Sequence, residues 1–183
     1  RQSAGLTPIA AWDFRNLTGT RGIILDTVGG YTATLNGIGT RSATGLAFDG
    51  MGGHLDLDLD LITFGGGPMT VVMTVKWFEL AQFGRIFCCG PVCSDDHNTI
   101  ALNNQNTASQ FRFMVSNGNN AMSASDALET DTNYHIVGTV EGTLMILYID
   151  GVEVGRKSDA AEPNAVPRAE CYVGKYNDKY LDG

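Results

Sequence analysis

The strongest constraint on the fold of this chain is the segment HLDLDLDL, residues 54–61, in which leucine and aspartate alternate without interruption. Successive side chains of a β-strand point to opposite faces, whereas helical side chains repeat about every 3.6 residues. The alternation therefore predicts a strand with one core face and one solvated face. The core face consists of Leu55, Leu57, Leu59 and Leu61, and the solvated face of Asp56, Asp58 and Asp60.

A period of two recurs between turn residues along the chain, and no long segment keeps a helical period. Strands are predicted over residues 6–14, 45–50, 69–78, 110–116 and 133–140, and Asp150-Gly151 predicts a hairpin turn. The strand over residues 69–78 is apolar on both faces, which indicates a central position. Trp12 and Trp77 lie in apolar strands and are expected in the core.

The 183 residues include 23 glycines, 17 % charged residues and no internal repeat or linker. This composition is typical of many short strands joined by tight turns. The sequence therefore predicts a single all-β domain over residues 1–183, a sandwich of two antiparallel sheets.

The formal net charge is −8, and the 12 lysines and arginines are scattered, which disfavours a nucleic-acid partner. No apolar run approaches the roughly 20 residues of a membrane helix, so insertion into a membrane is not expected. The sequence begins Arg1-Gln2, without Met or an apolar signal segment. We expect any targeting peptide to have been removed or to lie outside this sequence.

The cysteines are four in number, Cys88, Cys89, Cys93 and Cys171, and an N-x-T glycosylation sequon begins at Asn16. Together they predict a secreted or cell-surface protein, with buried free thiols and a chance sequon as the alternative. Neighbouring cysteines on a strand point to opposite faces and should take different partners. We expect Cys171 to bridge Cys88 or Cys89, and Cys93 to take the other. Zinc is disfavoured because no C-x-x-C pair occurs.

The segment NYHIVGTVEGTLMILYIDGVEVG, residues 133–155, resembles the hairpin pair of laminin-G-like jelly-roll domains, a branch of the concanavalin A-like lectins and glucanases. Residues 11–14 (AWDF), 26–30 (DTVGG), 45–50 (GLAFDG) and 69–77 are similar to other parts of that family, in the family's order. The resemblance implies a two-sheet jelly-roll sandwich. It also implies a closing strand that would begin where this sequence stops, at Gly183. We expect that strand to be truncated or supplied by another chain, which leaves a sheet edge open for strand addition or self-assembly.

Catalysis is not expected, because the Glu-x-Asp-x-x-Glu cluster of the family's glucanases is absent. The most similar group of carboxylates is Asp56, Asp58 and Asp60. Their flanking leucines already explain these aspartates as the solvated face of a strand. The resemblance further implies calcium, with Asp26 as the expected ligand and a plain turn residue as the alternative.

Recognition of a glycan needs an exposed aromatic ring beside amides and carboxylates. Two loops have that composition, with solvated connections as the alternative. The candidate ligand-binding residues are Tyr176, Asn177, Asp178 and Tyr180 in one loop, and Asp95, Asp96 and Asn98 in the other.

The sequence thus predicts a non-catalytic extracellular recognition or adhesion module that binds a glycan or a protein. One alternative is a structural subunit of an extracellular filament, wall or coat. Another is a polysaccharide hydrolase or lyase with an atypical site.

Overall fold

A computed structural model describes residues 8–15, 22–58, 63–80, 83–91, 93, 98–105, 109–115, 119–176 and 179–180. Every regular element among these residues is a β-strand. The strands are β1 (Ile23–Leu25), β2 (Thr32–Asn36), β3 (Gly39–Ser42), β4 (Gly45–Phe48), β5 (His54–Leu57), β6 (Thr63–Phe64), β7 (Met69–Lys76), β8 (Arg85–Gly90), β9 (Ile100–Asn104), β10 (Phe111–Val115), β11 (Asn119–Met122), β12 (Asn133–Glu141), β13 (Leu144–Ile149), β14 (Val152–Lys157), β15 (Val166–Pro167), β16 (Glu170–Val173), β17 (Lys175–Tyr176) and β18 (Lys179–Tyr180).

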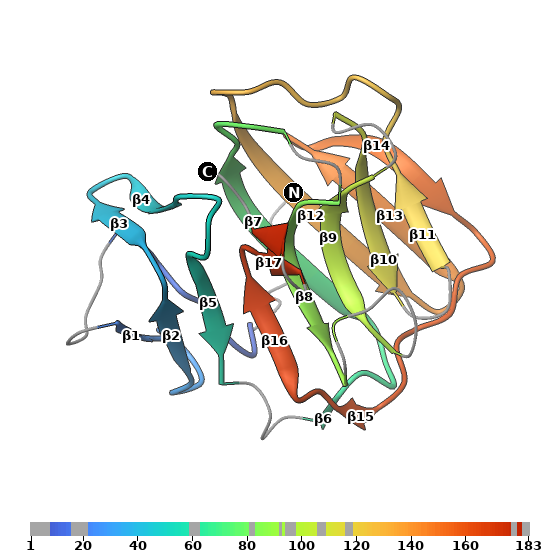
Figure 1. Ribbon diagram of the computed structural model, residues 1–183. Helices are drawn as coiled ribbons and strands as arrows, with labels where there is room; N and C mark the ends of the chain where they lie inside the picture. The colour runs from blue at the N-terminus through green and yellow to red at the C-terminus, as the bar shows by residue number, and fades with distance from the viewer. Residues whose placement is uncertain are drawn as a thin grey trace.

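The strands form two large antiparallel sheets that stack face to face (Figure 1). The larger sheet has eight strands in the order β1-β2-β5-β16-β8-β9-β10-β11, and the smaller has four in the order β14-β13-β12-β7. Three two-stranded pairs, β3-β4, β6-β15 and β17-β18, lie beside them. The predicted all-β, two-sheet antiparallel jelly-roll architecture is confirmed. Within the described part of the chain, no helix has the length and hydrophobicity that a membrane span requires.

The core lies between the two large sheets and is built from alternate residues of most strands. Strand β8, whose register shifts near Phe87, contributes both Ile86 and Phe87. Trp77 is fully buried, and its ring contacts Phe111 with 5.7 Å between the ring centroids. Gly138 of β12 faces Phe113 of β10, and a Cβ atom at Gly138 would lie 2.6 Å from the ring. A glycine at this position therefore lets the two sheets approach closely.

The alternating segment behaves as predicted where the structure describes it. Leu55 and Leu57 of β5 are buried in the core, while Asp56 faces outward and Asp58 is exposed. The rest of the segment, including Asp60, lies outside the described residues.

Two predictions about strands are wrong within the described residues. Residues 8–14 form no strand; instead, the Ala11 carbonyl accepts hydrogen bonds from the backbone N–H and the hydroxyl of Thr27. Strand β7 lies at the edge of the four-stranded sheet rather than at its centre. Its outward residues are Thr70, Val72, Thr74 and Lys76, so only one of them is apolar, and that alternation suits an edge strand.

The cysteines form two disulfides, Cys88–Cys93 and Cys89–Cys171. The prediction that Cys88 and Cys89 take different partners is confirmed, and the structure settles which partner each one takes. Cys89 and Cys171 face each other on β8 and β16 and belong to the main core. Cys88 and Cys93 belong to a smaller buried cluster on the opposite face of the same sheet.

The close contact at Gly138 predicts that one added methyl group at this position destabilises the fold. We expect Gly138→Ala to lower the free energy of unfolding by about 1–3 kcal/mol, because the added carbon overpacks against Phe113. Gly67→Ala is the matched control, since a Cβ there meets nothing within 4 Å. Urea denaturation of both variants measures the difference. Equal stability of the two variants would contradict the packing that we describe.

The two disulfides are expected to contribute unequally to stability. Cys89–Cys171 joins residues 82 apart, and Cys88–Cys93 joins residues only 5 apart. The chain-entropy model therefore assigns about 4–5 kcal/mol to the longer loop and clearly less to the shorter. Each cysteine pair is replaced by alanine, and urea denaturation curves then measure how much stability each disulfide contributes. A larger loss for the Cys88–Cys93 pair would contradict this ordering.

Candidate functional site

The face of the eight-stranded sheet that points away from the core has an exposed half and a covered half. Strands β2, β5 and β16 carry half-buried or exposed polar side chains on this face. Strands β8, β9 and β10 are buried on both faces. Strand β17 packs against β8 and lies in front of it in Figure 1. The exposed half is the surface that a ligand in solution meets.

Tyr172 stands at the boundary of the two halves. Its neighbours Cys171 and Val173 point into the core, so the alternation of β16 turns Tyr172 and Glu170 outward. Tyr172 pairs with Asp56 on β5 and is half-buried. The His54 ring contacts Tyr172 edge-on, with the centroids 6.1 Å apart.

Burial raises the pKa of Tyr172, and the negative charges of Glu170 and Asp56 raise it further. Both effects act against the ionised phenolate: burial removes water from it, and the carboxylates repel it. Tyr172 is therefore a neutral phenol that borders two carboxylates.

The outward aspartates of β5 are held by hydrogen bonds across the sheet. The Asp56 carboxylate accepts a bond from the Asn36 amide at 2.6 Å and lies 3.3 Å from His54 Nε2. The Asp58 carboxylate accepts a bond from the Thr32 hydroxyl at 3.2 Å. The side chain of Asp56 is nevertheless 48 % exposed. These bonds fix the carboxylates in place and leave Asp56 open to solvent.

We call Tyr172, Glu170, Asp56, His54 and Asn36 the Tyr172 site. Its members come from β16, β5 and β2, which are neighbours in one sheet. A sheet face holds its side chains rigidly, so the site is formed before any ligand arrives.

The covered half contains two buried arginines. Arg112 Nε donates to the amide oxygen of Asn103 at 3.1 Å, and an Arg85 guanidinium nitrogen lies 3.1 Å from the Cys88 sulfur. Arg85, Asn103 and Arg112 are all at most 6 % exposed. These positive groups face the same way as Asp56 but are withdrawn from solvent.

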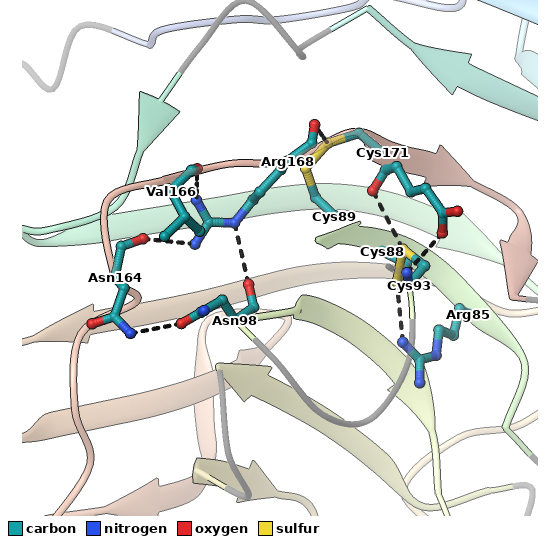
Figure 2. Close-up of a disulfide and its surroundings, with 10 residues drawn as sticks. Arg85, Cys88, Cys89, Cys93, Asn98, Asn164, Val166, Arg168 and Cys171 are labelled. Atoms are coloured by element: carbon teal, nitrogen blue, oxygen red, sulfur yellow. Dashed lines mark hydrogen bonds between the residues drawn. A yellow bond between two sulfur atoms is a disulfide. The ribbon is translucent and has the colours of Figure 1, made fainter. Parts of the chain in front are cut away.

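The Cys88–Cys93 disulfide ties a neighbouring loop to the Tyr172 site. The backbone N–H of Cys93 donates to the Glu170 carboxylate at 2.8 Å, and the Cys93 sulfur lies 3.4 Å from the Glu170 carbonyl oxygen (Figure 2). The disulfide thereby holds Glu170 beside Tyr172.

Asn98, a predicted ligand-binding residue, lies in a junction of loops around Arg168 (Figure 2). The buried Arg168 guanidinium donates to the backbone carbonyls of Asn98, Asn164 and Val166 at 3.0–3.3 Å. The Asn98 side-chain oxygen accepts a bond from the Asn164 amide at 2.7 Å. Burial lowers the pKa of Arg168. Asn98 is thus engaged in holding this junction together.

The other predicted ligand-binding residues are described in part or not at all. Asp95, Asp96, Asn177 and Asp178 lie outside the described residues, as does the sequon residue Asn16. Tyr176 and Tyr180 lie on β17 and β18, which pair as a short hairpin. Binding by these two loops stays a prediction.

Asp26 forms a turn. Its carboxylate accepts bonds from the backbone N–H groups of Gly29 and Tyr31, each at 2.7 Å, and of Val28. Burial alone would raise the pKa of Asp26, but the backbone hydrogen bonds together outweigh it and lower the pKa. Calcium needs converging oxygen ligands, and the Asp26 carboxylate already accepts three backbone N–H bonds, so calcium binding by Asp26 stays a prediction. No group of three or more His, Cys, Asp or Glu that could hold a metal occurs among the described residues.

Sequence analysis missed Tyr172 and His54 as site residues. The signal for Tyr172 was present, because Glu170-Cys171-Tyr172-Val173 alternates and Cys171 was expected to be buried in a disulfide. The same alternation places Tyr172 and Glu170 on the outer face. Which residues lie opposite them depends on the pairing of β16 with β5, which the local pattern does not give.

Two stacked antiparallel sheets define the fold of this chain as a jelly-roll sandwich. The family model of the concanavalin A-like lectin/glucanases superfamily matches residues 48–183, and the chain belongs to that superfamily. The resemblance noted in the sequence is therefore confirmed. No curated protein matches the sequence.

Solved structures share the fold at low sequence identity. A mutant of Trypanosoma rangeli sialidase that displays trans-sialidase activity matches with a TM-score of 0.68 and 17 % identity, over 97 % of this chain and 30 % of that one. Domain 4 of AbnA, a GH43 extracellular arabinanase from Geobacillus stearothermophilus, in complex with arabinotriose, matches with a TM-score of 0.67 and 17 % identity, over 86 % of this chain and 81 % of that one. The chain spans 28 % of the sialidase in complex with 2,3-difluorosialic acid, with a TM-score of 0.65 and 17 % identity over 90 % of this chain.

The raised pKa of Tyr172 predicts a specific alkaline titration. The folded state holds the phenol proton more tightly than the unfolded chain, whose pKa is about 10. The stability contributed by Tyr172 is therefore complete below about pH 10 and is lost as the pH rises toward the folded pKa. The difference in tyrosinate absorbance between the wild type and Tyr172→Phe isolates this titration.

Asp56→Asn removes one of the two negative charges and should lower the pKa of Tyr172 toward its ordinary value. A Tyr172 that ionises at or below the ordinary tyrosine pKa in the wild type would contradict the environment described here.

Proposed function

We propose that this chain is a non-catalytic extracellular recognition module that binds a glycan at the Tyr172 site. The observation that carries the proposal is a half-buried tyrosine on an open sheet face, bordered by the carboxylates of Asp56 and Glu170 and near the Asn36 amide. The site lies on three neighbouring strands; Tyr172, Glu170 and Asp56 are partly exposed, and His54 is buried beside them.

The chemistry of the site suits a sugar. A pyranose or furanose ring presents apolar C–H groups, which pack on aromatic rings, and hydroxyls, which bond to carboxylates, amides and other hydroxyls. Thr32 and Thr34 on β2 extend the row of hydrogen-bonding side chains away from Tyr172. A chain of sugars that crosses β16, β5 and β2 would meet polar groups at each step.

The similar structures support a sugar ligand. Domain 4 of AbnA shares the fold, and its structure contains arabinotriose. Two of the sialidase structures contain 2,3-difluorosialic acid and sialic acid, but this chain corresponds to less than a third of that enzyme.

Two disulfides support an extracellular location, because reducing compartments keep cysteines as thiols. The geometry of the aspartates supports binding without chemistry. Asp56 and Asp58 are each hydrogen-bonded across the sheet, and the sequence lacks the glucanase Glu-x-Asp-x-x-Glu pattern. Assembly through an open sheet edge and binding of a protein ligand stay predictions.

Replacing the tyrosine tests the proposal. A panel of glycans, including arabinan and sialylated oligosaccharides, is first screened against the wild type. We expect Tyr172→Ala to weaken binding of the ligand found by about tenfold or more, because the aromatic contact surface is lost. Isothermal titration calorimetry measures the change.

Tyr148→Ala is the matched control, since Tyr148 is also half-buried but lies on the outward face of the four-stranded sheet. It should leave binding unchanged. Equal losses in both variants, or a loss with Tyr148→Ala alone, would place the ligand elsewhere. Release of reducing sugars by the wild type, abolished by changing Asp56 or Asp58, would support the hydrolase alternative instead.

A further inference from the structure

The Tyr172 ring contacts an ammonium group of the same chain, that of Lys175. The Nζ atom of Lys175 lies 4.8 Å from the centroid of the ring. The chain reaches this position through Gly174, whose φ of 84° turns it back at the end of β16. A Cβ at Gly174 would lie 2.9 Å from the Phe48 ring, so a glycine is required here on two grounds. The turn places a positive charge over the aromatic face.

The surroundings of that ring favour a positive charge. The face of an aromatic ring carries negative electrostatic potential and attracts ammonium groups within about 6 Å. Asp56 stands opposite Tyr172 in the neighbouring strand, and Glu170 precedes it on the same face of β16. The negative charges of both carboxylates add to the effect of burial in raising the pKa of Tyr172, as this proximity requires. An aromatic face between two carboxylates is complementary to an ammonium ion.

We propose that the Tyr172 site binds a primary ammonium group, that Lys175 is its tethered occupant, and that an amine-bearing glycan displaces Lys175. This inference rests on the proposed function and names the class of sugar, an unacetylated hexosamine polymer. Thr32, Thr34 and Asn36 lie on β2, which pairs with β5, and they favour a sugar over a peptide because they supply partners for hydroxyl groups.

The Lys175 side chain can be displaced from the Tyr172 ring. Lys175 is only half-buried, and its four-carbon stem can swing away from the ring. A tethered group competes at an effective concentration of about millimolar. A polymer with many amines and additional hydrogen bonds overcomes that competition. The formal net charge of −8 also attracts a polycation and repels glycans that carry carboxylates or sulfates.

The test compares two oligosaccharides that differ only in the amine. At mildly acidic pH, glucosamine oligomers carry ammonium groups, and N-acetylglucosamine oligomers have the same backbone without that charge. We expect the glucosamine oligomer to bind at least about tenfold more tightly by isothermal titration calorimetry at moderate salt. Asp56→Asn should reduce this preference several-fold, because it removes one carboxylate and keeps the side-chain shape.

Lys175→Met is the decisive variant. It should strengthen binding of the glucosamine oligomer several-fold, because the internal competitor is gone. Lys76→Met is the matched control: Lys76 lies 4.7 Å over the Phe78 ring, at the end of β7, and its loss should leave binding unchanged. Circular dichroism melting checks that each variant folds.

The outcomes separate this inference from the proposed function. Equal binding of both oligomers, still dependent on Tyr172, overturns the ammonium site and leaves glycan recognition intact. Binding of a lysine-rich peptide that Lys175→Met strengthens, with no oligosaccharide bound, supports the ammonium site and overturns the glycan proposal. Weaker binding of the glucosamine oligomer by Lys175→Met overturns the role of Lys175 as a competitor.

Discussion

The packing of the two sheets against each other is the interaction on which the rest of the structure depends. Phe113 of one sheet lies against Gly138 of the other, and Trp77 packs beside Phe111 in the same layer. Because side chains alternate along a strand, burial of one set of residues fixes the direction of the other set. Burial of Leu55 and Leu57 turns Asp56 outward, and burial of Cys171 and Val173 does the same for Tyr172. The polar site is therefore a direct consequence of the core.

Features set by neighbouring residues could be predicted from the sequence. Asp150 and Gly151 both have positive φ angles, 52° and 79°, as a tight hairpin turn requires, and Ile149 pairs with Val152 across them. The opposite directions of Cys88 and Cys89 follow from the same local geometry. In each case the chemistry of a few adjacent residues leaves little choice of conformation.

Features set by distant pairing could not be predicted in the same way. Tyr172 meets Asp56 because β16 lies between β5 and β8, and no local pattern specifies that order. Residues 8–14 have the composition of a strand, yet their described partner is the turn at Thr27 rather than another strand. The position of Lys175 depends on the reversal at Gly174, a glycine among 23 whose particular role only the fold reveals.

The charge that a ligand meets also depends on the fold rather than on composition. Arg85 and Arg112 point to the same side of the large sheet as Asp56, but both are buried, whereas Asp56 is half-exposed. A ligand in solution can contact the Asp56 carboxylate directly, whereas the buried guanidinium groups are out of its reach. The packing of β17 against β8 and the Cys88–Cys93 disulfide both lie on the covered side. With that half covered, the carboxylates of Asp56 and Asp58 remain on the exposed half, and a carboxylate beside the Tyr172 ring favours a positively charged ligand.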